Sequence, residues 1–216
     1  MKRHLSNNSK GLTCFDVSRK DSNCQKSCKI SNVCYINNNI QDKMNKGYKE
    51  KMKRNFNLIN SDKFVSKLTK EIRFSNRLNI RLYGNGDISY NQKQGLKQID
   101  NICKLCYNNP KNRFWVITRN FNVLFEYFNK RQKPNNANFM LSVDFETNQF
   151  IFDFCKKHKI QTAFIVDKKK DSNCLSSQNK KSCLDNNCDL CFNYSVKPRK
   201  WFIHGFKNKE KFKDLK

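Results

Sequence analysis

The sequence predicts an α/β fold, built as a partial, open parallel β/α barrel of about six strand-helix units. Short segments rich in β-branched and aromatic residues alternate with segments in which apolar residues recur at helical spacing. The 216 residues include 18 Phe, which supply enough large side chains for one core. We therefore expect a single α/β domain over residues 1–216. A membrane span is not expected, because no run of about 18 apolar residues occurs.

The first elements precede the regular alternation. The segment at residues 9–16 (SKGLTCFD) contains a predicted short strand, which ends at Cys14. Residues 40–74 predict helix, because their large apolar side chains recur at broadly helical spacing with lysines between them. Polar residues at 60–62 interrupt this pattern. We therefore expect two helices, the second capped by Ser61 or Asp62.

Strands and helices then alternate up to the end of the chain. The predicted strands cover residues 78–83, 114–118, 138–144, 160–166 and 200–204. Predicted helices between them pass through residues 99–105, 121–128 and 148–158. This order requires crossover connections and so favours a parallel sheet.

Polar side chains follow several predicted strands at the point where each strand ends. In folds of this kind the chemistry lies at the carboxyl ends of the strands, so we expect these residues on one rim. The residues at this rim are Cys14, Asp87, Thr118, Arg119, Ser142, Asp144, Asp167 and His204. Asp87, Arg119 and Asp144 are the candidate catalytic residues.

The turn YGNGD at residues 83–87 places two flexible glycines and a carboxylate at the end of a strand. Gly84, Gly86 and Asp87, together with Ser142, are the candidate cofactor-binding residues. A tight turn whose Asp caps the next helix explains the same residues equally well. The sequence leaves both interpretations open.

Most of the eleven cysteines fall into two groups, one in a loop at residues 9–39 and one in an insert at residues 168–198. Closely spaced cysteines allow one loop to bring several thiolates to a single metal. Each group has enough sulfur for a tetrahedral metal site or an iron-sulfur cluster. The candidate ligands are Cys14, Cys24, Cys28 and Cys34 in the first group and Cys174, Cys183, Cys188 and Cys191 in the second.

A disulfide framework is the alternative, and it would require an oxidising compartment and an export signal. The basic start is followed by mostly polar residues at 5–10, which do not form the apolar segment of a signal peptide. An odd number of cysteines also fits full pairing poorly. We therefore expect a cytoplasmic, reducing location and favour metal binding.

The two cysteine groups differ in spacing. The second group has intervening gaps of eight, four and two residues, which indicate a closed site for zinc or an auxiliary iron-sulfur cluster. In the first group, Cys24, Cys28 and Cys34 would hold a 4Fe-4S cluster that leaves one iron open. All four cysteines of that group would instead hold a structural zinc.

Other cysteines and histidines have simpler expected roles. Cys103, Cys106 and Cys155 lie on predicted helices and are expected to pack as small apolar side chains. His158 is expected at the surface, whereas His204 ends a strand on the proposed rim and is a weaker candidate for a ligand or catalytic group.

The formal net charge of +26 favours a polyanionic partner such as nucleic acid. However, Lys, Asn, Phe and Ile are abundant together, which biased codon usage alone would produce. The basic residues are also scattered along the whole chain, as on a solvated surface. The charge therefore leaves nucleic-acid binding open.

The motifs, taken in order, resemble the phage gene-product-88 family, and the likeness covers nearly the whole chain. The matching pieces are LTC at 12–14, CY at 34–35, IRLYGNGDIS at 80–89, FWVITRN at 114–120, NFMLSVD at 138–144 and CDLCF at 188–192. The resemblance implies a phage or mobile-element origin and carries little settled biochemistry. The layout is also remotely similar to radical S-adenosylmethionine enzymes, in which a glycine-rich, acid-ended turn contacts the amino group of the cofactor.

Three hypotheses follow. The first is an iron-sulfur, radical S-adenosylmethionine-like protein with a second metal site, acting on an unknown, nucleic-acid-related substrate. The second is a non-catalytic zinc protein that binds nucleic acid through its basic surface. The third is a mobile-element remnant whose metal sites only hold the fold together.

Overall fold

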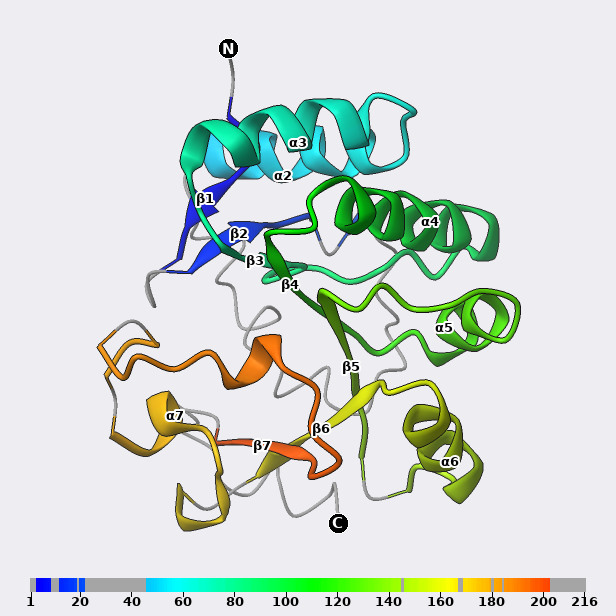
Figure 1. Ribbon diagram of the computed structural model, residues 1–216, viewed down its shortest axis with the longest axis vertical. Coiled ribbons are helices and arrows are strands. Elements are labelled where there is room, and N and C mark those ends of the chain that lie inside the picture. Colours follow the sequence, from blue (N-terminus) through cyan, green and yellow to red (C-terminus); the bar gives the residue numbers. More distant parts are fainter. Residues whose placement is uncertain are drawn as a thin grey trace.

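A seven-stranded sheet, with strands in the order in which they occur along the chain, organises the protein (Figure 1). The computed structural model describes residues 3–8, 12–18, 20–21, 46–144, 146–166, 169–179, 181–183 and 185–202. The strands are β1 (Ser6–Asn7), β2 (Thr13–Phe15), β3 (Asn79–Leu82), β4 (Arg113–Thr118), β5 (Ala137–Ser142), β6 (Gln161–Val166) and β7 (Arg199–Phe202). β1 pairs antiparallel with β2, and every later neighbouring pair is parallel.

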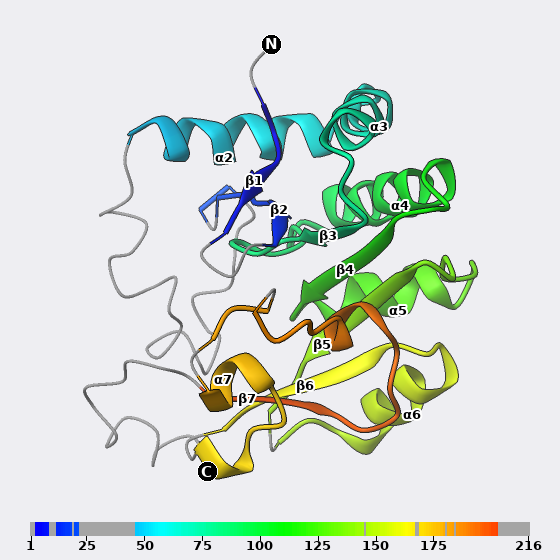
Figure 2. The ribbon, with the colours of Figure 1, turned by 60° about the vertical axis from the view of Figure 1, so that its left-hand side comes forward.

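Helices α4, α5 and α6 lie on one side of this sheet, and α7 and η2 lie on the other (Figure 2). The longer helices are α2 (Lys46–Ile59), α3 (Phe64–Ser75), α4 (Gln92–Asn108), α5 (Phe121–Phe128) and α6 (Gln149–Lys157). Between β6 and β7 come η1 (Lys169–Asp171), α7 (Leu175–Asn179) and η2 (Leu190–Phe192). Figure 2 shows α7 and η2 across the sheet from α4, α5 and α6. No described helix has the length and apolar character needed to cross a membrane.

Asparagine side chains start the three helices that follow β3, β4 and β5. The side chains of Asn91, Asn120 and Asn148 accept hydrogen bonds from backbone N–H groups in the first turns of α4, α5 and α6. Each cap satisfies an otherwise unpaired donor and stabilises its helix by about 1 kcal/mol. The abundant asparagines thus fix where each helix leaves the sheet.

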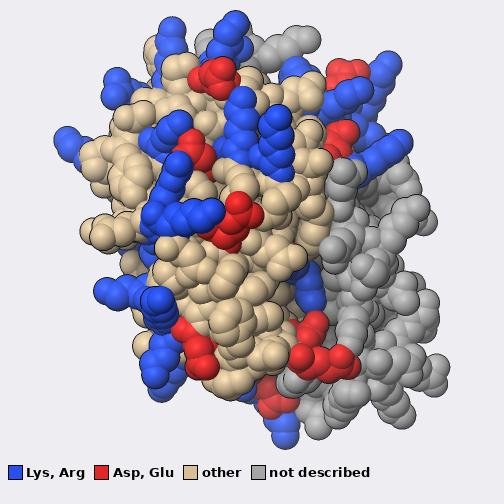
Figure 3. Space-filling model, turned by 90° about the vertical axis from the view of Figure 1, so that its right-hand side faces the viewer, with Lys and Arg blue, Asp and Glu red and all other residues tan. Residues whose placement is uncertain are grey.

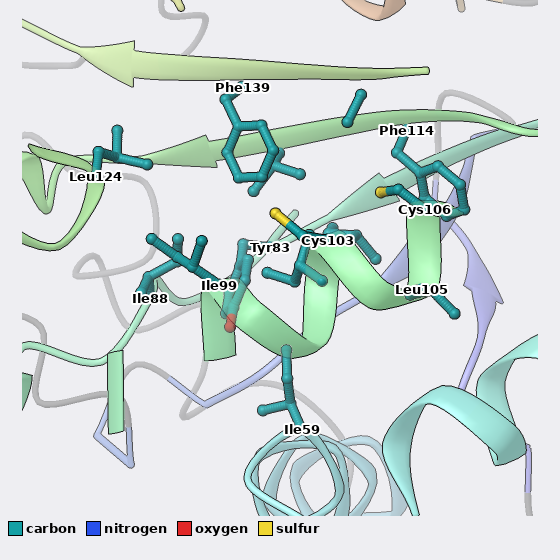
Figure 4. Packing of buried hydrophobic residues seen from close by; sticks show 14 of the residues in the cluster. Ile59, Tyr83, Ile88, Ile99, Cys103, Leu105, Cys106, Phe114, Leu124 and Phe139 are labelled. Atoms are coloured by element: carbon teal, nitrogen blue, oxygen red, sulfur yellow. The ribbon is translucent and has the colours of Figure 1, made fainter. Parts of the chain in front are cut away.

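The helix-covered face of the sheet carries the main hydrophobic core. Alternate strand residues such as Phe114, Val116 and Phe139 point into it and are fully buried. Figure 4 shows Cys103 and Cys106 of α4 among these side chains. Both cysteines are buried, as the sequence predicts, and burial raises the pKa of Cys103 to about 12 and raises that of Cys106 well above its usual value. They are packing residues in this core.

The opposite face of the sheet carries a second, smaller cluster. Its buried members are Leu12, Cys14, Trp115, Met140, Ala163 and Phe192. Phe192 belongs to η2, so the connection between β6 and β7 covers part of this face. The rings of Phe192 and Trp201 lie 6.1 and 6.0 Å from the ring of Trp115.

The predicted α/β class, parallel strands and alternation are confirmed, and the described sheet is open, with β1 and β7 at its edges. The predicted cap of the second helix is wrong. α3 starts after Lys63 without a side-chain cap, and the Ser61 hydroxyl donates backwards to the Leu58 carbonyl instead. Ser61 therefore closes the end of α2. Cys24, Cys28, Cys34, Asp167 and His204 lie outside the described residues.

Candidate functional site

The loops that follow β3, β4 and β5 meet at the carboxyl edge of the sheet. Asp87 lies in the turn after β3, Arg119 directly follows β4, and Asp144 follows β5. A backbone hydrogen bond of 3.1 Å joins Arg119 N to Asp87 Oδ2, and an ion pair of 3.0 Å joins Arg119 Nη2 to Asp144 Oδ2. The structure thus brings the three candidate catalytic residues together.

Asp87 is buried at the centre of this network. Its Oδ1 accepts hydrogen bonds from the Thr118 hydroxyl and from Ile88 N, and its Oδ2 accepts from the Tyr90 hydroxyl as well as from Arg119 N. Burial raises the pKa of Asp87 to about 6, because it disfavours the charged carboxylate more than the four donors favour it. The carboxylate therefore joins the loop after β3 to the end of β4.

Asp144 is likewise engaged by neighbouring groups. Its Oδ1 accepts a hydrogen bond from the Thr147 hydroxyl, whose oxygen in turn accepts from Asp144 N. Asp144 and Arg119 keep 29% and 19% of their side chains exposed, so this ion pair is the part of the network that faces solvent. A polar ligand at this edge would meet Arg119 and Asp144 rather than Asp87.

The glycine-rich turn packs closely against the end of β2. A Cβ atom on Gly84 would lie 2.5 Å from Asp16 Oδ1, and one on Gly86 would lie 2.5 Å from the Val17 carbonyl oxygen. Gly86 also has a φ of +78°, in the left-handed region that favours glycine. These contacts support a tight turn. The expectation that Asp87 caps the next helix is wrong, because Asn91 caps α4 and Asp87 bonds to Thr118 and Arg119 instead.

Asp16 is a site residue that the sequence analysis missed. Its Oδ1 accepts a hydrogen bond from Asn85 N at 2.8 Å, and its Oδ2 accepts from the Tyr48 hydroxyl at 2.6 Å. Asp16 thereby ties α2 and the glycine-rich turn to the end of β2. Its place directly after a strand, at the predicted rim, was the signal that could have identified it.

A row of aligned residues crosses the second face of the sheet. Cys14 on β2 aligns with Arg81 on β3, Arg81 with Trp115 on β4, and Trp115 with Asn138 on β5. The Arg81 guanidinium carbon lies 4.4 Å from the centre of the Trp115 ring, a cation–π contact. Asn138 Nδ2 donates to the carbonyl oxygen of Cys191 at 3.0 Å. This row meets the connection between β6 and β7.

Cysteines from distant parts of the chain gather around this row. Cys183 and Cys191 pack against the same cluster in which Cys14 is buried. Burial raises the pKa of Cys14 to about 12, with further increases from Asp16 and Cys183, while Arg81 and Lys51 lower it. Burial also raises the pKa of Cys191 to about 12, and the nearby thiols of Cys174 and Cys183 raise it further.

Two further candidates, Ser142 and Cys188, lie at the carboxyl end of β5 and in the connection between β6 and β7. Ser142 is half-buried and aligns with Ala163 at the end of β5. Cys188 is half-buried in a turn, where its N–H donates to the Cys183 carbonyl at 2.9 Å. Within the described ranges, no group of three or more His, Cys, Asp or Glu side chains is already arranged to hold a metal ion.

The fold and these two sites define an α/β protein with one mostly parallel sheet, helices on one face and a cysteine-bearing connection on the other. The family comparison is consistent with the motifs on these strands. The chain belongs to the Gene product 88 (GP88) family, whose model matches residues 3–204. No curated protein and no solved structure matches the chain.

Proposed function

We propose that this protein binds a metal ion through the thiolates of the connection between β6 and β7. The observation that carries the proposal is the packing of Cys183 and Cys191 against the second face of the sheet, beside Trp115. Soft thiolate ligands in a partly dry setting suit zinc or an iron-sulfur cluster. The proposed ligands are the four cysteines of this connection, Cys174, Cys183, Cys188 and Cys191.

The enzymatic form of the proposal adds a 4Fe-4S cluster at Cys24, Cys28 and Cys34 and S-adenosylmethionine at the carboxyl edge. Its support is the sequential order of the mostly parallel strands, an order that a partial β/α barrel would also have. The Asp87 carboxylate does not fit a cofactor amino group, because four internal donors already occupy it. Metal binding therefore stands independently of that cofactor.

The metal proposal predicts that changing two cysteines of the connection abolishes stoichiometric binding. Cys183→Ser with Cys191→Ser should lower zinc affinity by about 100-fold or more, because two soft ligands are lost. Cys103→Ser with Cys106→Ser is the matched control, since these cysteines lie on the helix face. Zinc titration, with iron and sulfide analysis after anaerobic reconstitution, measures the outcome. A wild-type chain that retains neither zinc nor iron would overturn the proposal, and zinc without iron or sulfide would reject its enzymatic form.

A second candidate function, nucleic-acid binding, is favoured by the outer faces of α2 and α3. Exposed lysines recur at helical spacing along each helix, which places each set on one side. The sets are Lys46, Lys49 and Lys53 on α2, and Lys67 and Lys70 on α3 with Lys63 directly before that helix. The acidic residues of these two helices are Glu50 and Glu71, and the Glu71 carboxylate accepts hydrogen bonds from the backbone N–H groups of His4 and Leu5. On the side of the molecule that Figure 3 shows, acidic side chains lie between the basic ones.

If these lysines bind nucleic acid, replacing them should reduce the salt dependence of the binding affinity. Changing Lys63, Lys67 and Lys70 to Gln should weaken binding to a duplex of mixed sequence and reduce the slope of log K against log salt by up to about 3, near 0.9 per phosphate contact. The control changes Lys130, Lys156 and Lys157 to Gln, with the same change in net charge. Filter binding over a range of salt concentrations distinguishes the sets. If both sets of substitutions weaken binding equally, the protein binds through its overall net charge and not through a face formed by these helices.

A further inference from the structure

Large apolar side chains are exposed together where α3 and α4 end. Phe74 in the last turn of α3 is 83% exposed, and Tyr107 near the end of α4 is 58% exposed. Leu78, just before β3, is 63% exposed. A single exposed apolar side chain is ordinary on a protein surface, whereas neighbouring ones mark a place where a partner binds.

Hydrogen bonds hold these two helix ends beside each other. The Asn109 side-chain amide at the end of α4 donates to the Thr69 hydroxyl of α3 at 2.8 Å. The Asn112 side-chain amide donates to the Arg77 carbonyl in the connection after α3. Figure 1 shows α3 and α4 next to each other in the helix layer. The exposed apolar side chains therefore belong to one end of this helix pair.

Exposed cations lie among these apolar side chains. Lys70, Arg73 and Phe74 share one side of α3, because residues three and four apart in a helix are neighbours. Arg77 and Lys111 lie in the connections that follow α3 and α4. All four cations are exposed, and none forms an ion pair with another described residue. Phosphate groups would meet unpaired positive charge here.

The acidic residues of the same two helices are already bonded. The Asp100 carboxylate of α4 pairs with Lys104 and Arg131. The Glu71 carboxylate of α3 accepts hydrogen bonds from the backbone N–H groups of residues 4 and 5. Cations outnumber these two carboxylates, so this end of the helix pair is positive and complements a polyanion.

The ring of Tyr107 is oriented before any partner binds. Its hydroxyl donates to the Gln132 carbonyl at 3.2 Å, while most of its side chain stays exposed. A ring that is already fixed loses little conformational freedom when a flat partner stacks on it. Aromatic rings among cations are the combination that binds single-stranded nucleic acid, in which every unpaired base offers a flat face.

We propose that the joined ends of α3 and α4 bind single-stranded nucleic acid. Bases would stack on Phe74 and Tyr107, and the four exposed cations would bind the phosphates. This inference rests on the second candidate function, and it names the form of the nucleic acid and the place where it binds. A duplex keeps its bases stacked on one another, so it would reach the cations without using the rings. An apolar protein or a lipid would use the rings only as apolar area, which a leucine replaces.

Phe74→Leu and Phe74→Tyr test the inference by fluorescence anisotropy. The probes are a labelled oligodeoxythymidine of about 20 nucleotides and a mixed-sequence duplex of the same length. We expect Phe74→Leu to weaken oligodeoxythymidine binding by about 5-fold or more and to leave duplex binding unchanged, because only the ring stacks on a base. Phe74→Tyr should keep the wild-type affinity for both probes. The slope of log K against log salt should stay the same, since the phosphate contacts remain.

Phe150→Leu is the matched control, because Phe150 is 54% exposed but lies on α6. It should leave both affinities unchanged. Tyr107→Leu should weaken oligodeoxythymidine binding by about 5-fold or more, and its combination with Phe74→Leu should bind more weakly than either variant. Both rings are exposed, so these variants should unfold at the wild-type temperature, which thermal unfolding checks.

Wild-type affinity for oligodeoxythymidine in the double variant would overturn the inference. Equal weakening of single-strand and duplex binding would do the same, because the rings would then not act on unpaired bases. A wild-type chain that binds only the duplex would overturn the inference alone. Absence of binding to both probes would instead overturn the second candidate function.

Discussion

Replacing Asp87 with Ala should lower the free energy of unfolding by about 3–5 kcal/mol. The substitution leaves four donors without their acceptor, among them the Thr118 hydroxyl and Arg119 N. It also separates the loop after β3 from the end of β4, because Asp87 is the residue that joins them. Urea unfolding followed by circular dichroism measures the change. Asp153→Ala, on the exposed side of α6, is the control and should change stability by about 0.5 kcal/mol or less.

The same residue should give a distinctive pH dependence. The pKa of Asp87 is about 6 in the folded protein, above its ordinary value near 3.8, so the folded state holds this proton up to a higher pH than the unfolded state. Stability contributed by this group is therefore present below about pH 4 and is lost as pH rises towards 6, by about 2–3 kcal/mol. Asp87→Asn should remove this slope from the difference between the two unfolding curves. An identical slope in both proteins would show that Asp87 is not the group responsible.

These two results would also separate two roles for the carboxyl edge. A buried carboxylate with four internal donors stabilises loops, whereas a ligand-binding carboxylate keeps an acceptor free for its ligand. Asp87 has the first arrangement. Arg119 and Asp144 retain partial exposure, so any ligand bound at this edge is expected to contact that pair.

The fold was largely predictable because its signals are local. Nearly continuous apolar runs in segments such as 114–118 and 138–142 mark strands that are buried on both faces, and Asn91, Asn120 and Asn148 mark the helix starts. The start of α3 was missed because Ser61 and Asp62 resemble helix caps. The Ser61 hydroxyl instead donates a hydrogen bond to the Leu58 carbonyl at the end of α2.

The site was less predictable because it depends on which strands align. Sequence spacing groups Cys14 with the cysteines that follow it. Strand pairing instead places Cys14 on the same face of the sheet as Arg81 and Trp115, the face that η2 covers. Neither Arg81 nor Trp115 carries a motif that marks it as a site residue. If Cys14 belongs to the second face, the first group keeps Cys24, Cys28 and Cys34, the number of thiolates that an open 4Fe-4S cluster requires.

Gly86→Ala should destabilise the protein by about 2–4 kcal/mol, which would establish the turn as a structural element. The new methyl group would lie 2.5 Å from the Val17 carbonyl oxygen, and the φ of +78° adds strain for any residue with a Cβ. Gly47→Ala in the exposed first turn of α2 is the matched control and should be neutral or stabilise by up to about 1 kcal/mol. Opposite signs for the same chemical change, measured by thermal unfolding, would show that Gly86 is required by its contact with the end of β2. If both variants were equally stable, the motif would need a ligand-based explanation, and the carboxyl edge would again be the place to look for a cofactor.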